Sequence, residues 1–517
     1  MPLILPTDWR GRVRRGAGLS PDHAALSQRV LARAVELAQA GPVVAESEPG
    51  GRRLGFARTL ADRVRHALVA HALSADPKHL QLLESDLRVA LDLPDWADDH
   101  LLDMAELATA LALALDGAGP FVSRDLADEV ADALCRRFLI RAIASVQGGS
   151  RWSRQAGNWA FVCGGAMIMV AAVVGSHQAR AGLAQTATRA AQAALGPSLA
   201  AIGPDGEWPE GVVYRDLAAA YGWLAMQAAQ NVPALQISPD TFRPLLRGAG
   251  LRAALTGPSG LIADFGDDLP QAPLPVLGPP HRHLPDGAFD PLHLLWGCQM
   301  EGDDAPPPPV FLGRYHAVLR QGDDFLALRI GDCAAHDHAH ADLGAPVWDH
   351  GRQRLLTDPG RGDYAAPGYF DPTRRLALPG VCETDHGTLT LPDFPQAAQM
   401  SAEAGMQGDA LVLTMRAAGQ LLWQRRLWFA APGHLRIADR SLRGITGPAR
   451  WQAVVPQGVT VLADLPKGTV AEHGRWASAK GGGTRLGFEV TADALTAGVQ
   501  VGLRVGSVQA VDTNHHP

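Results

Sequence analysis

A histidine-rich stretch at residues 336–342 has the residue types and spacing best suited to chemistry. It places three imidazoles and two carboxylates within seven residues. In an extended conformation alternate side chains share a face, so His336, His338 and His340 would lie in one row. Neighbours in that row are about 7 Å apart at their Cα atoms. An adjacent pair can therefore serve one centre, whereas the whole row cannot.

Two further motifs supply the partners that a metal centre would need. Asp358 begins an Asp-Pro-Gly motif, and His386 begins a His-Gly-Thr motif. Imidazole and carboxylate groups are common ligands of zinc. A His/Asp/His zinc site is therefore one interpretation, and a solvated histidine-rich loop is the alternative.

The elements that must position these residues change in kind along the chain. Apolar residues recur at helical spacing over 60–68, 101–115 and 126–138. The apolar run at 160–175 is shorter than the roughly 20 residues of a membrane span, which indicates a buried helix. After residue 310, short segments with a period of two flank turns that contain glycine.

This change of period predicts a multidomain α+β organisation. We expect a helical domain over residues 1–268, a proline-rich linker over 269–309 and an antiparallel β-sandwich domain over 310–517. A long series of helical hairpins without strands is typical of a bundle, a solenoid or a toroid.

Composition restricts the class of partner. The net charge of −7 over 517 residues provides no general basic field, so we expect no nucleic-acid partner. Lysine occurs only at Lys78, Lys467 and Lys480, so arginine and histidine would have to bind an anionic ligand. The absence of a signal peptide predicts a cytoplasmic protein if the N-terminus is as given, with a periplasmic location as the alternative. We expect no membrane span, and a homo-oligomer is compatible with the sequence.

Two motifs in the helical half carry polar groups. Asn158 and Trp159 open the glycine-rich apolar helix, where the amide would point into a cleft or cap the helix. A carboxylate-rich turn that includes Glu210 ends at Tyr214, just before another predicted helix. A core or capping role for this tyrosine is the alternative to a role in chemistry.

Taken in order, these motifs resemble those of the heparinase II/III-like polysaccharide lyases, a family that includes oligoalginate lyases. The resemblance rests on five groups of residues: Asn158-Trp159 with Val162-Cys163-Gly164-Gly165; Asp205-Gly206 with Glu210-Gly211 and Tyr214; His338-Ala339-His340-Ala341-Asp342; Asp358-Pro359-Gly360; and His386-Gly387-Thr388. It implies an incomplete (α/α) toroid followed by an antiparallel β-sandwich.

The resemblance also implies β-elimination on an anionic polysaccharide or oligosaccharide that contains uronic acid, such as a glycosaminoglycan or alginate. A base removes the C5 proton, an acid protonates the C4 oxygen, and the product carries a 4,5-double bond. Asn158 and His338 would polarise the substrate carboxylate, and Tyr214 would be the acid or a shared acid and base.

Binding roles are implied in the same way. A structural zinc ion would be held by His340, Asp358 and His386. The residues implied to contact substrate are Trp159, Glu210, Tyr369 or with less weight Tyr364, and Arg374 or Arg375.

The sequence departs from the family pattern at three positions. Gly157 replaces a common asparagine, Ala160 replaces a residue that is often polar, and Gly387 replaces an asparagine. Fewer groups then remain to neutralise a substrate carboxylate. A catalytically degenerate carbohydrate-binding relative with a structural zinc is therefore one alternative. A zinc-dependent hydrolase, in which the metal keeps an open position for water, is another.

Overall fold

A computed structural model describes residues 3–45, 48–269, 290–296, 306–332, 336–396, 399–478 and 481–506. The chain divides into two compact units, and each is discontinuous in sequence. Met1–Ile202, Arg215–Ala249 and Pro273–Asp304 form the helical unit, whereas Gly203–Tyr214, Gly250–Ala272 and Ala305–Pro517 form the strand unit. Within the described ranges, no helix is long and apolar enough to cross a membrane.

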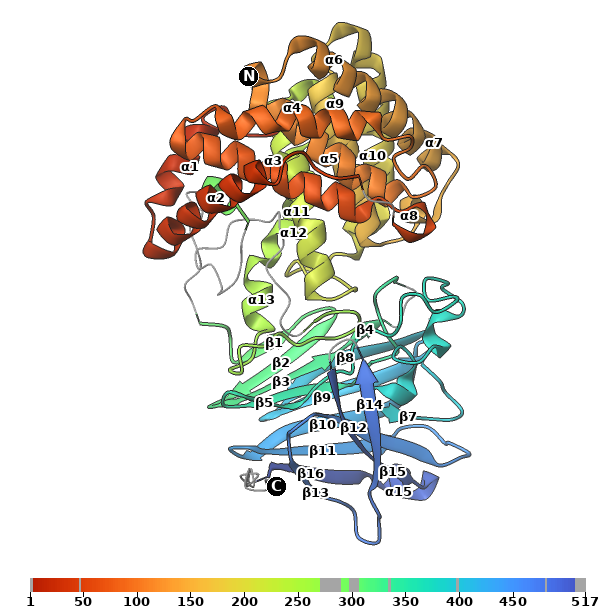
Figure 1. Cartoon of the computed structure of the whole chain (residues 1–517). Coiled ribbons are helices and arrows are strands. Elements are labelled where there is room, and N and C mark those ends of the chain that lie inside the picture. The colour runs from red at the N-terminus through yellow and green to blue at the C-terminus, as the bar shows by residue number, and fades with distance from the viewer. Residues whose placement is uncertain are drawn as a thin grey trace, which may run out of the picture. The chain divides into compact units, whose positions relative to one another are not determined.

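Two buried helices lie at the centre of the helical unit (Figure 1). Helices α5 (Leu101–Ala118) and α9 (Asn158–Val174) bury almost every side chain, since alanine, leucine and valine surround each axis. Helix α5 packs against α3 and α9, and α9 packs against α10. The apolar run at 160–175 is thus a buried helix, as predicted.

The outer helices show the amphipathic pattern that the sequence indicated. Ser20 caps α2 through the N–H of His23, and Pro21 occupies its first turn. A π-helical turn, Leu134–Leu139, joins α6 to α7 without a break. The remaining longer helices are α1 (Trp9–Ala17), α2 (Pro21–Gln39), α3 (Leu54–Ser74), α4 (Lys78–Asp92), α6 (Arg124–Ala133), α7 (Ile140–Gln147), α10 (Ala181–Ala201) and α11 (Val212–Asn231).

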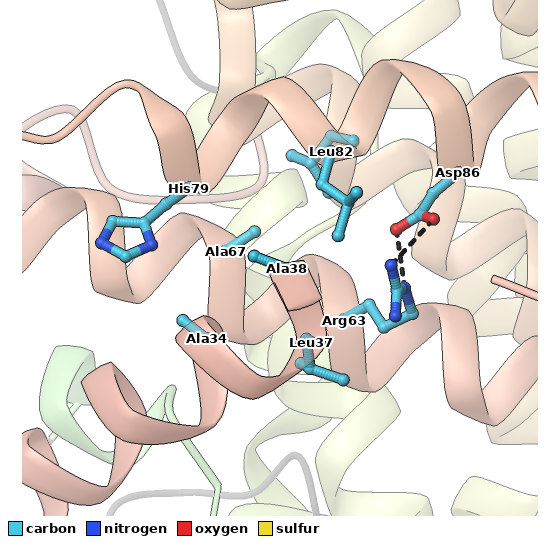
Figure 2. Close-up of a pocket in the computed structure, with 9 residues that line it drawn as sticks. Ala34, Leu37, Ala38, Arg63, Ala67, His79, Leu82 and Asp86 are labelled. Carbon is cyan, nitrogen blue, oxygen red and sulfur yellow. Dashed lines mark hydrogen bonds and ion pairs between the residues drawn. The ribbon is translucent and has the colours of Figure 1, made fainter. Parts of the chain in front are cut away.

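A small hollow between α2, α3 and α4 shows how this unit buries charge (Figure 2). Arg63 and Asp86 bond each other at one side of it, with Arg63 Nε 2.8 Å from Asp86 Oδ2. The hollow holds only about 20 Å³, which is room for about one water molecule. It is therefore a packing feature of the helical unit and too small for a sugar.

The strand unit contains three antiparallel sheets (Figure 1). Their strand orders are β1-β2-β3-β5-β6, β13-β16-β11-β10-β9-β8-β4 and β14-β15-β12-β7. The strands are β1 (Val310–Leu312), β2 (His316–Gln321), β3 (Asp324–Arg329), β4 (Gly331–Asp332), β5 (Pro346–His350), β6 (Gln353–Leu356), β7 (Leu389–Thr390), β8 (Met400–Gln407), β9 (Ala410–Ala417), β10 (Gln420–Ala431), β11 (His434–Ser441), β12 (Ala449–Pro456), β13 (Val461–Asp464), β14 (Glu472–Ser478), β15 (Gly481–Val490) and β16 (Val499–Val505).

One hydrophobic core joins the three sheets. Leu326, Trp423 and Trp451, one from each sheet, belong to the same buried cluster. The hairpins predicted at Gly322 and Gly351 are present, and both glycines have positive φ angles, as tight turns require. Helices followed by antiparallel sheets are thus confirmed, and closure of the helices into an incomplete toroid stays a prediction.

The units do not follow the single boundary that we placed at residue 268. Segment Gly203–Tyr214 and most of segment Gly250–Ala272 lie within the predicted helical domain but group with the strands. They bring Tyr214 and Asp267 into the strand unit. Most of the predicted linker, residues 270–289 and 297–305, lies outside the described residues.

Candidate active site

The histidine-rich stretch forms a turn in the strand unit, between β4 and β5. Residues 337–338 are in the turn, so the extended row considered above does not form. His338 and His340 are buried, at 6% and 1% exposure, whereas His336 is half-buried. Asp342 accepts a hydrogen bond from the N–H of Gly266 at 3.2 Å, which ties the stretch to a neighbouring loop.

The two buried histidines meet at the carboxylate of Asp267. Nδ1 of His338 lies 2.7 Å from Asp267 Oδ2, and Nε2 of His340 lies 2.8 Å from Oδ1. Gly266 has a φ of +62°, and a Cβ there would collide with the carbonyl oxygen of His338. The Asp267 N–H donates to that same carbonyl at 3.0 Å. Glycine therefore permits the close approach of the two loops.

Three more side chains donate to the same carboxylate. The hydroxyls of Tyr364 and Tyr369 lie 3.0 and 2.5 Å from its oxygens, and Nη2 of Arg375 lies 3.3 Å away. Burial alone would raise the pKa of Asp267, but hydrogen bonds from its two histidines hold that pKa well below its ordinary value. Asp267 is therefore an anion at neutral pH, and it fixes the donors around it.

Tyr214 lies against this cluster at the start of α11. Its ring stacks on that of His338, with centroids 3.6 Å apart and planes at 8°. Its hydroxyl oxygen is 2.7 Å from that of Tyr364. Because Tyr364 donates its one hydroxyl proton to Asp267, Tyr214 is the donor between the two tyrosines.

The start of α11 is held by the residue after Asp267. Asp268 accepts hydrogen bonds from the N–H groups of Val212 and Val213 at 2.6 and 3.1 Å, which satisfies two of the free donors of the helix. A carboxylate at this end also complements the helix dipole. The position of Tyr214 thus depends on a segment more than 50 residues away in sequence.

The ionisation of Tyr214 is shifted by its surroundings. Burial and the negative charge of Asp267 raise the pKa of the Tyr214 phenol above its ordinary value. The side chain is only half-buried, so it is also accessible. At neutral pH it is a protonated hydroxyl group, which suits a proton donor.

The second cluster consists of His340, Asp358 and His386. One potential ligand atom from each lies within 4.8 Å of the others, and all three side chains are buried. Nδ1 of His386 is 2.7 Å from Asp358 Oδ2, and Nε2 of His386 is buried with no hydrogen-bond partner among the described residues. Two imidazoles and a carboxylate at this spacing fit a tetrahedral zinc ion after a small contraction.

The remaining predicted residues have different surroundings. Arg374 is exposed, whereas Arg375 is 2% exposed and bonds Asp267 and the carbonyls of Ala339 and Tyr369. The predicted contact of Arg375 with a substrate is therefore not supported, because its donors are used inside the protein.

Glu210 is also enclosed by the protein. It is 1% exposed and accepts a hydrogen bond from Trp208 Nε1 at 2.8 Å. Burial raises the pKa of its carboxyl group. The carboxyl group is thus enclosed in this structure, and its predicted contact with substrate stays a prediction.

The preference between the two tyrosines is reversed. Tyr369 is 2% exposed, whereas Tyr364 is half-buried and bonds Tyr214. Tyr364 is therefore the better candidate to face a ligand. Asp267 was not among the predicted site residues, and its only sequence signal is a Gly-Asp-Asp turn before the prolines.

Asn158 and Trp159 belong to the helical unit. Asn158 is the first residue of α9 and is 4% exposed, with Gly157 at the N-cap. The ring of Trp159 packs on that of His100 with centroids 5.1 Å apart. Their predicted roles toward a substrate stay predictions.

Three solved structures resemble this chain over most of its length. The crystal structure of heparinase III matches with a TM-score of 0.60 and 15% identity, over 91% of this chain and 80% of that one. A mutant of the heparan sulfate lyase HepC from Pedobacter heparinus gives 0.57 and 12%, over 98% and 93%. The chondroitin AC lyase of Streptomyces coelicolor A3, in complex with chondroitin sulphate, gives 0.52 and 13%, over 98% and 83%.

No family model matches the sequence, and no curated protein does. At these identities the similarity concerns the fold. The predicted resemblance to the heparinase II/III-like family is confirmed at that level, because heparinase III itself shares the fold of the chain.

Proposed function

We propose that this chain, which has the fold of heparinase-type polysaccharide lyases, cleaves a uronic-acid-containing anionic glycan by β-elimination. The observation that carries the proposal is the stacked pair of Tyr214 and His338, joined through Tyr364 to the buried carboxylate of Asp267. It places a proton donor beside a nitrogen base.

Tyr214 is the acid in this proposal. Its raised pKa keeps the hydroxyl protonated, and the side chain as a whole is only half-buried. When the bond between C4 and the glycosidic oxygen breaks, this proton passes to the leaving oxygen. In the structure this proton is donated to the Tyr364 oxygen, and it turns from there to the leaving oxygen for the transfer.

His338 is the base. Its Nδ1 carries the proton that bonds Asp267, so in the neutral ring Nε2 holds the lone pair. That nitrogen accepts the C5 proton, and the C–H electrons form the C4–C5 double bond. Asp267 then stabilises the resulting imidazolium, as an aspartate does for other catalytic histidines. The geometry thus favours a base over the polarising role that the family resemblance implied for His338.

The charge that develops on the substrate carboxylate needs further donors. Asn158 is our proposed donor, following the family resemblance. His340, Asp358 and His386 would hold a zinc ion, which would supply fixed geometry to the loops around it. Asp267 would also restrict the orientation of His338, because His340 bonds the same carboxylate.

The comparison with solved structures supports our proposal for the substrate class. Two of the similar structures are named for their action on heparan sulfate and chondroitin. We propose a glycan in which uronic acid alternates with another sugar, and alginate remains a second substrate to test.

The decisive experiment is a screen of uronate oligosaccharides and polymers, followed by absorbance in the near ultraviolet. A lyase produces a 4,5-unsaturated uronate that absorbs there. A zinc-dependent hydrolase would produce saturated reducing ends, and a carbohydrate-binding relative would bind without product. Saturated products, or binding without product, would refute the proposal. Unsaturated product formed by Tyr214→Phe at the wild-type rate would refute the role of Tyr214 as the acid.

A further inference from the structure

A solvent-open hollow lies beside the candidate active site, within the strand unit. It holds about 490 Å³, within the range of about 300 to 1,000 Å³ that is usual for small-molecule sites. Its lining comes from two loops and the end of β14: Arg361, Gly362, Asp363, Tyr364, Pro379, Gly380 and Ala477. None of these residues was among the predicted metal ligands or catalytic groups.

Tyr364 connects the hollow to the reacting groups. Its ring forms part of the wall, and its hydroxyl bonds Tyr214 at 2.7 Å and Asp267 at 3.0 Å. A ligand in the hollow would therefore be separated from the proposed acid, Tyr214, by the Tyr364 side chain. A sugar next to the reacting uronate would occupy such a place.

The hollow carries a cation that suits an anionic sugar. The guanidinium of Arg361 lies over the Tyr364 ring, 4.7 Å from its centroid. It is half-buried, and no described carboxylate lies within ion-pair distance of it. Stacking on the ring orients the planar guanidinium, whose fork of N–H groups matches carboxylate and sulfate oxygens.

The other lining groups suit the neutral part of a sugar. Asp363 is exposed, and its Oδ1 accepts the Ala365 N–H at 2.9 Å. Its carboxylate can also accept sugar hydroxyl donors, and it would repel an anion placed on its side. Together with Arg361, it would orient a ligand that has an anionic group at one end and hydroxyls at the other.

Close glycine packing fixes the shape of the hollow. A Cβ on Gly362 would lie 2.5 Å from the carbonyl oxygen of Pro379, and one on Gly380 would lie 2.9 Å from the Cα of Gly362. The Gly380 N–H donates to Asp385 at 2.6 Å, and Asp385 pairs with Arg485 at 2.7 Å. The two loops are therefore tied together before any ligand binds.

We propose that this hollow is a subsite for a sugar adjacent to the one that reacts, and that Arg361 binds its carboxylate or sulfate group. The inference rests on the proposed function for the identity of the ligand as a glycan. The hollow, its cation and its link to Tyr214 are features of the strand unit alone.

The test compares Arg361→Ala and Arg361→Lys with Arg352→Ala, an exposed arginine in the β5–β6 turn of the same unit. Each change is made in wild type and in Tyr214→Phe, where binding is measured calorimetrically without turnover. The ligands are uronate oligosaccharides of equal length, with and without sulfate. Unfolding midpoints equal to that of the parent establish that each variant is folded.

We expect Arg361→Ala to weaken binding roughly tenfold or more and to raise KM with little change in kcat, because it removes ground-state contacts. Arg361→Lys should recover part of the loss, because it keeps the charge without the fork. Arg352→Ala should bind as its parent does. A loss confined to sulfated ligands identifies sulfate as the group bound, and an equal loss for all ligands identifies the carboxylate.

Two results would overturn the subsite. One is Arg361→Ala binding every ligand as tightly as Arg352→Ala does. The other is a fall in kcat with KM and binding unchanged, which would make Arg361 a support for Tyr364. Unsaturated product with either result leaves the proposed lyase intact. Arg361-dependent binding without unsaturated product sustains an anionic-sugar site and refutes the lyase.

Discussion

Buried carboxylates do different work in the two units. In the helical unit, Asp86 accepts hydrogen bonds from Nε and Nη2 of Arg63 and from the N–H of Val43. In the strand unit, Asp267 accepts from two histidines, two tyrosines and an arginine. The first arrangement neutralises one charge and closes a helix contact, whereas the second holds several proton-bearing side chains in fixed orientations. Asp86 therefore serves the packing of the helices, whereas Asp267 orients the side chains of the proposed active site.

The largest effect should come from Asp267→Asn. The amide would leave His338 in the wrong tautomer and Tyr364 without its acceptor, so kcat should fall by roughly 10³- to 10⁴-fold. Turnover is measured by absorbance of the unsaturated product, with the unfolding midpoint as the check on folding. Turnover within tenfold of wild type would show that Asp267 is only structural.

The next effect should be on stability, from Asp86→Asn. Removal of one partner of a buried pair leaves the Arg63 charge uncompensated, which costs about 3 to 5 kcal/mol. Chemical denaturation measures the loss, and kcat of the folded variant should equal that of wild type. The control is Asp98→Asn, because Asp98 pairs with Arg141 at 2.7 Å on the surface, with 41% and 44% of the side chains exposed. That change should cost about 1 kcal/mol or less. Equal losses from the two variants would contradict the interpretation of Asp86.

Removal of His340 should lower both the zinc content and the stability of the protein. His340→Ala deletes one of three proposed ligands, so zinc content and unfolding midpoint should fall together. His338→Ala should lose turnover while it keeps its zinc. Metal content is measured by elemental analysis of the purified variants. Unchanged zinc stoichiometry in His340→Ala would refute the division between ligand and base.

The smallest expected effect concerns a third buried carboxylate, Asp290, in the helical unit. Its nearest described cation, Arg65, lies 3.4 Å away, and burial raises the pKa of Asp290 to about 6. A pKa raised from 3.8 means that the folded state binds the proton more tightly than the unfolded state does. Its stabilising contribution is therefore complete below about pH 4 and is lost as pH rises through 6, for a total of about 3 kcal/mol.

The measurement for Asp290 is the unfolding free energy of Asp290→Asn relative to wild type between pH 4 and pH 7. This difference should move in favour of the variant as pH rises, because asparagine does not titrate. A difference that stays constant with pH would contradict the raised pKa. The pKa of Asp267 is instead lowered, because hydrogen bonds from His338 and His340 outweigh the effect of its burial.

The grouping of the three proposed metal ligands was predictable because their types and order are visible in the sequence. His340, Asp358 and His386 lie in short motifs, and the structure brings them together. The helices were predictable from periodicity, as α5 and α9 show. These features can be predicted from the sequence because they depend on side chains only a few residues apart.

The rest depends on contacts between distant segments. Asp267 was not predicted because a carboxylate before a proline-rich run resembles any turn, and its contacts form only where its own loop meets residues 338–340 and 364–375. The relative burial of Tyr364 and Tyr369 was not predictable for the same reason, since both lie in one aperiodic loop. Glu210 was assigned to substrate because nothing in its local sequence reveals that it is buried.

The adjacent residues Asp267 and Asp268 hold different parts of the proposed catalytic pair. The first bonds His338, and the second bonds the start of the helix that carries Tyr214. The two carboxylates that hold the proposed acid and base are therefore one peptide unit apart, a distance fixed by covalent geometry. An insertion of one residue between these two aspartates should separate the stacked rings while the sheets and the metal ligands stay in place. A surface turn such as the one at Gly351, which bonds none of these residues, should tolerate the same insertion without that consequence.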